Sequence, residues 1–181
     1  LLLIAGPAAA GAGLLILSFV KQTSGPSEYW TTFFPGFMVF GLGMSFTVAP
    51  LTAAVMGSVS DQLSGTASGI NNALTRISNV FANAIFGALA VLFFAGALQV
   101  GIKTIPLNVK EKQAVVAQAT NLGNAKVPAG VSPENKAIIE RAYHESFIHA
   151  YANIMRISAG LAFLGALMSV AFIRNVAVKK S

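Results

Sequence analysis

Long apolar runs alternate with polar segments along this chain. A helix needs about 20 mostly apolar residues to cross the hydrocarbon core of a bilayer. Four runs reach about that length, and they cover residues 1–20, 33–56, 70–100 and 148–173. Polar connections separate them at 21–32, 57–69 and 101–147, and a basic tail follows at 174–181. The pattern predicts an all-α membrane protein with four transmembrane helices.

The three connections differ in character. Residues 21–32 and 57–69 are predicted as short polar turns, and the first carries Tyr29 and Trp30, aromatic residues that favour the membrane interface. Residues 101–147 hold most of the charged residues and contain two amphipathic stretches that we predict to be helical, 108–122 and 133–147. Ser132, Pro133 and Glu134 match a helix start, with a hydroxyl cap, proline at the first position and an acid in the first turn. We expect the second stretch to continue directly into the last span.

Basic residues bear on orientation. An even number of spans places both ends of the chain on the same side as 57–69. A raw count of Lys and Arg favours the opposite side as cytoplasmic, but most of those residues lie in the long segment 101–147, where the positive-inside rule gives them little weight. The compact tail with Arg174, Lys179 and Lys180 therefore favours cytoplasmic termini and an extracytoplasmic segment 101–147.

Composition supports a lipid environment and excludes several function classes. The chain has 181 residues, of which 55% are hydrophobic and 10% charged, and its mean hydropathy is +0.69, whereas a soluble domain carries about 25% charged residues. It contains no cysteine and two histidines, so we expect no disulfide and no metal site. The net charge of +6 is scattered rather than clustered, which argues against nucleic-acid binding. Because the chain begins at Leu1 inside an apolar run with no signal peptide, we expect it to be part of a longer protein.

None of the four predicted spans contains Asp or Glu. Proton-coupled transport needs a titratable group in the membrane, and Arg76 and Arg156 cannot serve because guanidinium does not deprotonate. A coupling carboxylate would therefore lie in another part of a larger protein. Residues 101–147 contain Tyr143, His144 and several glutamates, but no nucleophile and base at motif spacing. We predict no enzymatic activity and no cofactor.

The stretch "SGTASGINNALTR", residues 64–76, combines glycines, amides and an arginine within an apolar context. It lacks the lysine and the glycine spacing of a phosphate-binding loop. Gly65 and Gly69 instead have the spacing that lets two membrane helices approach closely. A polar stripe follows on one helix face, because residues three and four apart are neighbours: Asn72, Arg76, Asn79 and Asn83.

Lipid cannot satisfy such a stripe, so two interpretations remain. In one, the amides form hydrogen bonds between helices and the arginine reaches the headgroups. In the other, the stripe lines a transport pathway or a domain interface. Arg156 in the last span also has two interpretations, reaching the nearer membrane surface or pairing with Asn153.

The second span contains Gly36, Gly41, Gly43 and Pro50. One interpretation is tight packing, since Gly and Pro are common in membrane helices. The other is a deformable helix that lines a cavity, where methionine and phenylalanine adapt to many apolar ligands. The candidate substrate-pathway residues are Met44, Phe46, Thr47, Pro50 and Thr52.

Residues 29–89, "YWTTFFPGFMVFGLGMSFTVAPLTAAVMGSVSDQLSGTASGINNALTRISNVFANAIFGAL", resemble the major facilitator superfamily, and within it the fourteen-helix drug:proton antiporters (EmrB/QacA-like). The matching pattern is a glycine-rich helix ending in Pro50-Leu51-Thr52, a short turn with Gly-x-Ala-Ser-Gly, then an Asn-Asn pair and Arg76. The match is specific over some sixty residues and weak elsewhere. Residues 77–83, "ISNVFAN", depart from the small residues of many relatives, so we expect different packing there.

The resemblance implies that the four spans correspond to helices 11 to 14, the last four of the C-terminal half. The second span would line the central cavity and the third would face the other half of the transporter. The implied function is proton-coupled efflux of amphipathic drugs by alternating access in the bacterial cytoplasmic membrane. The implied partners are the lipid bilayer, the remaining helices of the same transporter, a small-molecule substrate and protons. The alternative is a stand-alone four-helix membrane scaffold or a small oligomeric exporter.

Overall fold

The computed structural model describes residues 2–23 and 25–178. All regular structure in these residues is helical, which confirms the all-α prediction. In chain order the elements are α1 (Leu2–Leu17), η1 (Pro26–Glu28), α2 (Tyr29–Thr32), α3 (Phe34–Met56), η2 (Asp61–Leu63), α4 (Ser64–Gly101), α5 (Val109–Ala117), η3 (Gln118–Asn124) and α6 (Pro133–Val178). Lys179 and Lys180 of the predicted tail lie outside the described residues.

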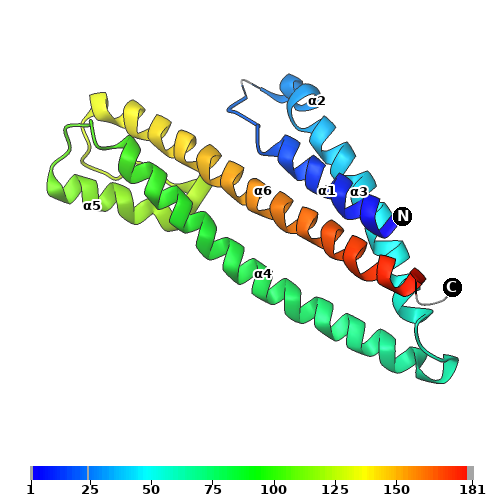
Figure 1. Ribbon diagram of the computed structural model, residues 1–181. Coiled ribbons are helices and arrows are strands. Elements are labelled where there is room, and N and C mark those ends of the chain that lie inside the picture. The colour runs from blue at the N-terminus through cyan, green and yellow to red at the C-terminus, as the bar shows by residue number, and fades with distance from the viewer. Residues whose placement is uncertain (1, 24, 179–181) are drawn as a thin grey trace.

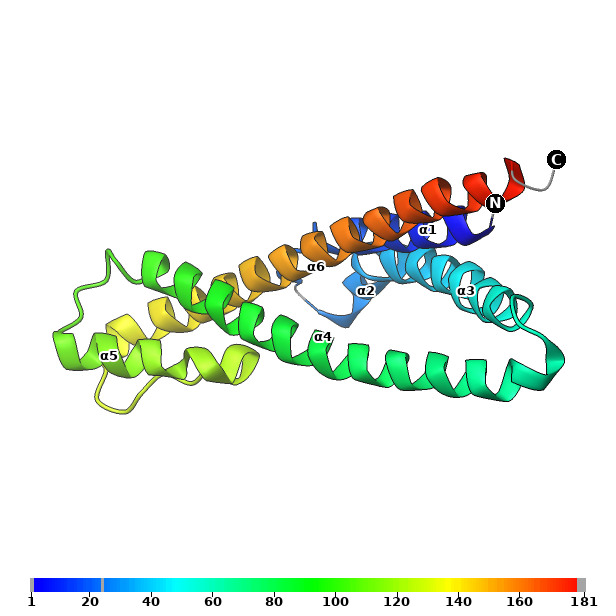
Figure 2. The same ribbon diagram turned by 60° about the horizontal axis from the view of Figure 1, so that its bottom comes forward.

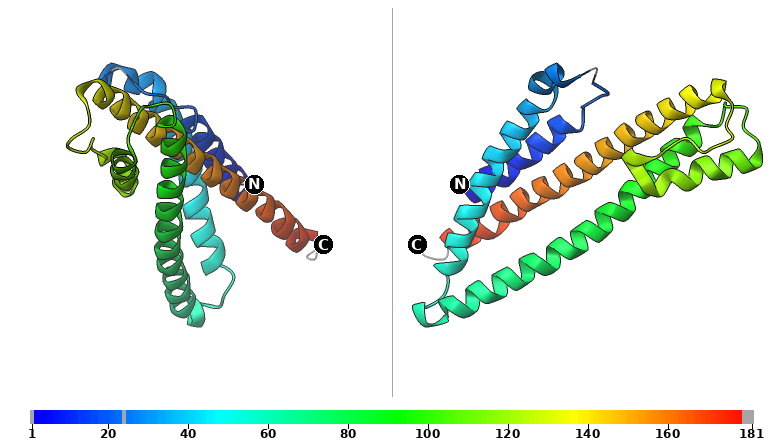
Figure 3. Two further views of the ribbon diagram at one scale, coloured as in Figure 1. Left: turned by 90° about the vertical axis from the view of Figure 1, so that its left-hand side faces the viewer. Right: turned by 180° about the vertical axis from the view of Figure 1, so that it is seen from behind.

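The molecule is an elongated arrangement of two helical pairs (Figure 1). Helices α1 and α3 form one pair, and α1 packs this pair against the C-terminal part of α6. Helices α4 and α6 form the other pair and converge toward α5, whereas the first half of α4 runs apart from α6 (Figures 1 and 2). The beginning of α1, the end of α6 and the turn between α3 and α4 lie toward one end, and α5 lies at the other (Figure 3). This is the arrangement expected for an even number of spans.

Among the described residues, three helices are long and apolar enough to cross a membrane: Phe34–Met56, Ser64–Gly101 and Pro133–Ala171 within α6. The first predicted span, residues 1–20, differs, because α1 has 16 residues and ends at Leu17. Beyond it, Ser18 donates its hydroxyl to the Leu15 carbonyl at 2.7 Å. This hydrogen bond satisfies a carbonyl at the end of α1, and the chain leaves the helix there. At 1.5 Å per residue α1 rises about 24 Å, less than the roughly 30 Å of a hydrocarbon core.

Helices α1 and α3 meet in a seam built from glycines. Gly6 and Gly13 of α1 and Gly36 and Gly43 of α3 are buried at this contact. Gly13 and Gly36 lie opposite one another, whereas Gly6 lies against Thr47 and Gly43 lies against Ala10. A Cβ atom at Gly6 would lie 2.6 Å from Thr47 Oγ1, and one at Gly43 would lie 2.7 Å from Ala10 Cα. The two backbones are therefore too close for any side chain at these positions. This close approach maximises dispersion contacts, which drive helix association in lipid.

Helix α3 continues through Pro50 without interruption. Proline removes one backbone hydrogen bond and crowds the preceding turn. Nearby hydroxyls bond to the helix backbone one turn earlier: Ser45 to the Gly41 carbonyl at 3.0 Å, Thr47 to Gly43 at 2.7 Å and Thr52 to Val48 at 3.0 Å. These bonds satisfy the hydroxyls inside the helix, so α3 exposes no free hydroxyl at these three positions.

A second packed region, which we call the cap, joins α5 and η3 to the end of α4 and the beginning of α6. Its centre contains side chains with no exposed surface, among them Phe94, Leu98, Val115 and Ile139. The Tyr143 ring stacks on Phe94 with centroids 6.3 Å apart. Its hydroxyl donates to the Val115 carbonyl at 3.1 Å. Apolar burial and this hydrogen bond together hold α5 on the α4–α6 pair.

The predicted helix starts in the polar segment are confirmed. The Asn108 side chain accepts from Glu111 N at 2.9 Å, and the Glu111 carboxylate accepts from Asn108 N at 2.9 Å, which is a reciprocal capping box. The Ser132 hydroxyl accepts from Asn135 N at 3.3 Å and precedes Pro133 at the start of α6. From there α6 continues for 46 residues, so the amphipathic stretch and the last span form one helix, as expected.

The prediction for residues 57–69 was wrong in its second half. Helix α4 begins at Ser64, so Gly65 and Gly69 lie in its first two turns rather than in a connection. The turn itself is shorter and includes η2 (Asp61–Leu63). Serine, threonine and alanine fill the positions between the glycines, and the apolar run behind them lets the helix extend through this weakly helix-forming stretch.

Candidate functional site

The polar stripe lies on the first half of α4. All four side chains, Asn72, Arg76, Asn79 and Asn83, are exposed. From Gly69 to Phe81 every residue except Asn71 is exposed, because neither α3 nor α6 covers this part of the helix. The structure therefore brings the stripe together on one face, as predicted, and leaves that face without a neighbour among the described residues.

The stripe lies on the same face of α4 as the residues in the second half of the helix that pack on α6. Asn83 and Ala97 are 14 residues apart, which is close to four turns at 3.6 residues per turn. The opposite face is apolar and equally exposed, with Leu74 at 60% and Phe81 at 63% of their possible surface. One face of α4 thus suits lipid, and the other suits protein or water.

The predicted close approach at Gly65 and Gly69 is wrong for the described chain. No atom lies within 4 Å of a Cβ built at either position. The close approach occurs instead at the α1–α3 seam, where the expectation of tight packing at Gly36 and Gly43 is confirmed. The partner positions Gly6 and Gly13 were missed, although both follow the small-residue spacing of "GPAAAGAG" in the first apolar run.

The candidate substrate-pathway residues do not share a face of α3. Thr47 contacts α1 at Gly6, and Pro50 is half-buried. Met44 and Phe46 are exposed at 40% and 47% on either side of that contact. Thr52 is exposed and bonded to its own helix. The structure places two of these residues, Met44 and Phe46, where an apolar ligand or lipid can reach them.

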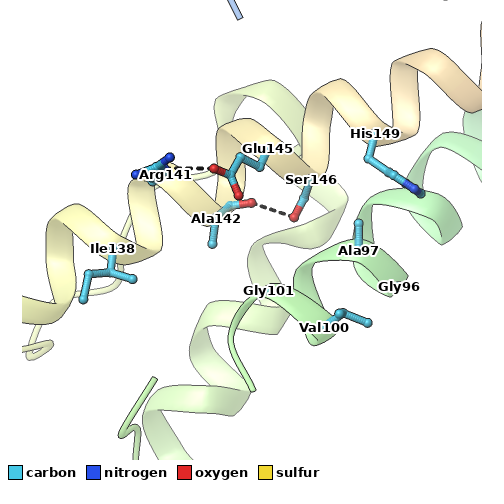
Figure 4. Close-up of a pocket in the computed structure, with 10 residues that line it drawn as sticks. All are labelled: Gly96, Ala97, Val100, Gly101, Ile138, Arg141, Ala142, Glu145, Ser146 and His149. Atoms are coloured by element: carbon cyan, nitrogen blue, oxygen red, sulfur yellow. Dashed lines mark hydrogen bonds and ion pairs between the residues drawn. The ribbon is translucent and has the colours of Figure 1, made fainter. Parts of the chain in front are cut away.

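A pocket of about 470 Å³ lies between the C-terminal end of α4 and the N-terminal part of α6 (Figure 4). Small residues of α4, Gly96, Ala97 and Gly101, leave the space. On the α6 side the polar groups are already bonded, Arg141 to Glu145 at 2.9 Å and the Ser146 hydroxyl to the Ala142 carbonyl at 2.6 Å. The pocket therefore offers an apolar hollow and no set of converging catalytic groups.

Arg156 lies beside the end of α1. Its guanidinium carbon is 6.0 Å from the centre of the Phe19 ring, a cation–π distance. Asn153 does not pair with it, since the Asn153 amide contacts His149 Nδ1 at 3.3 Å. The guanidinium is directed toward the level at which α1 ends, which agrees with the interpretation that it reaches the nearer membrane surface.

Comparison with protein-family models, with curated proteins and with solved structures finds no match to this chain. The strongest functional feature is thus the polar stripe itself. It combines three amides and a permanent positive charge on one face of a helix whose opposite face is apolar and which is long enough to cross a membrane.

Proposed function

We propose that this chain is the membrane-embedded C-terminal part of a secondary active transporter of the major facilitator type. In this proposal it exports amphipathic small molecules across the bacterial cytoplasmic membrane in exchange for protons. Support comes from the family-like motif in residues 29–89 and from three helices long and apolar enough to span a bilayer. The alternating-access cycle would move one set of helices against another around a central pathway.

The observation that carries the proposal is the uncovered polar stripe on α4. On insertion scales an arginine costs about 2.5–3.5 kcal/mol at the centre of a membrane helix and less toward its end. Arg76 lies about two turns into the predicted span 70–100, and Asn79 and Asn83, which lie deeper, add their own cost. A helix that only anchors a protein gains nothing from four such residues on one face. A helix that borders a water-filled pathway or a second half of the transporter needs them, because they bond to water in one state and to protein in another.

The remaining parts of the mechanism follow from what the spans lack. Because none of the four predicted spans contains a carboxylate, the proton-coupling group belongs to other helices of the transporter. Arg76 would then either form hydrogen bonds with those other helices or repel a cationic substrate in the pathway. Met44 and Phe46 on α3 would contribute adaptable apolar contacts to the substrate.

Transport measured with Arg76→Ala tests the proposal. The full transporter is produced in cells without other exporters of the dye ethidium, and efflux is followed by fluorescence. We expect the initial efflux rate to fall about tenfold, which corresponds to about 1.4 kcal/mol. The amount of protein in the membrane should not change, because the helix remains apolar enough to insert.

Lys103→Ala is the matched control, since it removes one exposed positive charge just beyond α4. It should leave efflux unchanged. Normal ethidium efflux by Arg76→Ala would contradict a transport role of the stripe. A protein that inserts into the membrane and supports no solute movement at all would favour the alternative, a membrane scaffold.

A further inference from the structure

A pocket of about 470 Å³ lies where α1 ends beside the middle of α6, a position visible in Figure 1. We call it the α1-end pocket. Its lining includes Phe19, Lys21 and Gln22 from the segment after α1, and Glu145, His149 and Arg156 from α6. These residues are far apart in the sequence, and the packing of α1 against α6 brings them together.

The α1-end pocket is positively charged. Lys21 lines it from the segment after α1, and Arg156 lines it from α6. Glu145 also lines it, but its carboxylate already accepts from Arg141 Nε at 2.9 Å. That is the one ion pair within the part of the chain that the structure describes. Two cations and one carboxylate that is paired elsewhere therefore line the shared space, which leaves it with a net positive charge.

A histidine also lines the pocket. His149 Nδ1 lies 3.3 Å from the Asn153 amide nitrogen, and its ring adds a polar group beside the two cations. Lysine and arginine together supply the several donors that match the acceptor oxygens of a phosphate group.

Apolar side chains complete the lining of the pocket. Phe19 is 67% exposed, and Ile148 and Ala152 line the same pocket. The pocket also lies at the level where α1 stops, close to the predicted end of the first span at Val20. At this level phospholipid headgroups meet acyl chains, and basic pockets between membrane helices bind anionic headgroups.

We propose that the α1-end pocket binds the phosphate headgroup of an anionic phospholipid. Lys21 and Arg156 contact the phosphate oxygens, and the acyl chains lie along Phe19. The bound lipid links the segment after α1 to α6 at the end of their direct contact. This proposal goes beyond the transport proposal and needs only that the helices lie in a membrane.

A lipid is favoured over free phosphate because of the exposed aromatic ring. Free phosphate is strongly hydrated and gains nothing from Phe19, whereas an acyl chain gains free energy with each methylene group that it buries against the ring. The Phe19 ring also faces the Arg156 guanidinium. Phe19 thus limits the position of the Arg156 guanidinium and provides an apolar surface for the acyl chain below the headgroup.

Native mass spectrometry of the protein in neutral detergent tests the proposal with dioctanoyl phosphatidylglycerol. Dioctanoyl phosphatidylcholine, with the same chains and no net charge, is the lipid control. We expect phosphatidylglycerol to bind on the order of tenfold more tightly. Lys21→Gln and Arg156→Gln should each weaken its binding about fivefold, by loss of one cation–phosphate contact.

Lys136→Gln is the matched protein control, because it removes an exposed lysine of α6 outside the pocket. It should bind phosphatidylglycerol as the unchanged protein does. Circular dichroism of each variant confirms that the helices are intact, and Arg156→Lys provides a second variant that keeps the charge and should retain most of the binding.

Three results would overturn the proposal. They are equal binding of the two lipids, unchanged phosphatidylglycerol binding in both glutamine variants, and displacement of phosphatidylglycerol by millimolar inorganic phosphate, which would make the pocket a site for a free anion. The assay contains no transport step, so failure of ethidium efflux and failure of lipid binding are separate outcomes.

Discussion

The two halves of α4 form one continuous helix in opposite environments. Both halves carry large apolar side chains, yet Phe94 and Leu98 in the second half have no exposed surface, whereas Val80 and Phe81 in the first half, beside the polar stripe, are 70% and 63% exposed. The difference comes from the neighbours, since α5, η3 and α6 pack around the second half. Hydropathy therefore predicts that a segment is helical and avoids water, but it does not predict which face another helix covers.

Glycines give the same lesson. At Gly43 the backbone of α1 occupies the space a side chain would need, whereas at Gly69 that space is open. Both positions belong to small-residue patterns spaced for close packing. The seam forms because α1 presents small residues opposite the glycines of α3, Ala10 at Gly43 and Gly13 at Gly36, and Gly69 of α4 meets no such partner within the described residues.

The largest effect is expected from truncating the packed half of α4. Phe94→Ala should lower the free energy of unfolding by about 3–5 kcal/mol, because it leaves a cavity in the cap and removes the stack on Tyr143. Phe81→Ala, in the exposed half, should change it by less than about 0.5 kcal/mol. Unfolding of the purified protein in mixed micelles by increasing sodium dodecyl sulfate measures both. Equal losses would mean that the first half of α4 is packed as well.

The next effect is expected in the seam. Gly43→Ala places a methyl group against the Ala10 backbone, which cannot move without shifting α1, and should cost about 1–3 kcal/mol. Gly69→Ala should be neutral or stabilise the helix by about 0.5–1 kcal/mol, since alanine loses less backbone entropy than glycine. The same unfolding assay compares the two. A loss at Gly69 equal to that at Gly43 would show that α4 closes against another helix.

A smaller effect is expected in the cap. Tyr143→Phe removes the hydrogen bond to the Val115 carbonyl and keeps the ring in place. The carbonyl still accepts from Gln118 N, so the cost should be only about 0.5–1.5 kcal/mol. Tyr29→Phe, at an exposed ring, is the control and should have no effect. Far greater loss in Tyr143→Phe would mean that the cap depends on this bond rather than on apolar burial.

The smallest effect on stability, and the sharpest distinction between the faces of α4, should come from single cysteines. The chain contains no natural cysteine, so Asn79→Cys and Asn83→Cys on the stripe can be compared directly with Leu74→Cys and Phe81→Cys on the opposite face. In intact membranes a charged maleimide should label the stripe positions about tenfold faster, because thiolates form only in water. Equal labelling of all four positions would contradict the assignment of the opposite face to lipid. Unreactive cysteines at the two stripe positions would favour a stripe that hydrogen-bonds between helices.

Local signals in the sequence predicted the helices well. The Asn108 and Ser132 caps lie within a few residues of the groups they bond, and the apolar runs behind α3, α4 and α6 are long enough to be unambiguous. The start of α4 was missed, because glycine and serine are weak helix formers and only the context extends the helix through them.

Contacts between distant segments were harder to predict. The Tyr143 hydroxyl bonds to a carbonyl 28 residues away, and the seam depends on which glycines of α1 meet which of α3. The stripe was found because its pattern lies within one helix. The α1-end pocket was not, because Lys21 and Arg156 meet only through the packing of α1 on α6.

Helix α6 runs through 46 residues from the cap to the opposite end of the molecule, and its sequence contains no proline after Pro133. At 1.5 Å per residue it is about 70 Å long, and sharp helix kinks need proline or a similar disruption. No such disruption therefore separates the cap from the part of α6 on which α1 packs. We expect a displacement of the cap to tilt α6 as a whole and to move α1, and with α1 the seam that it forms with α3. A protein or antibody that binds only the cap would thus act on a helix pair it does not touch.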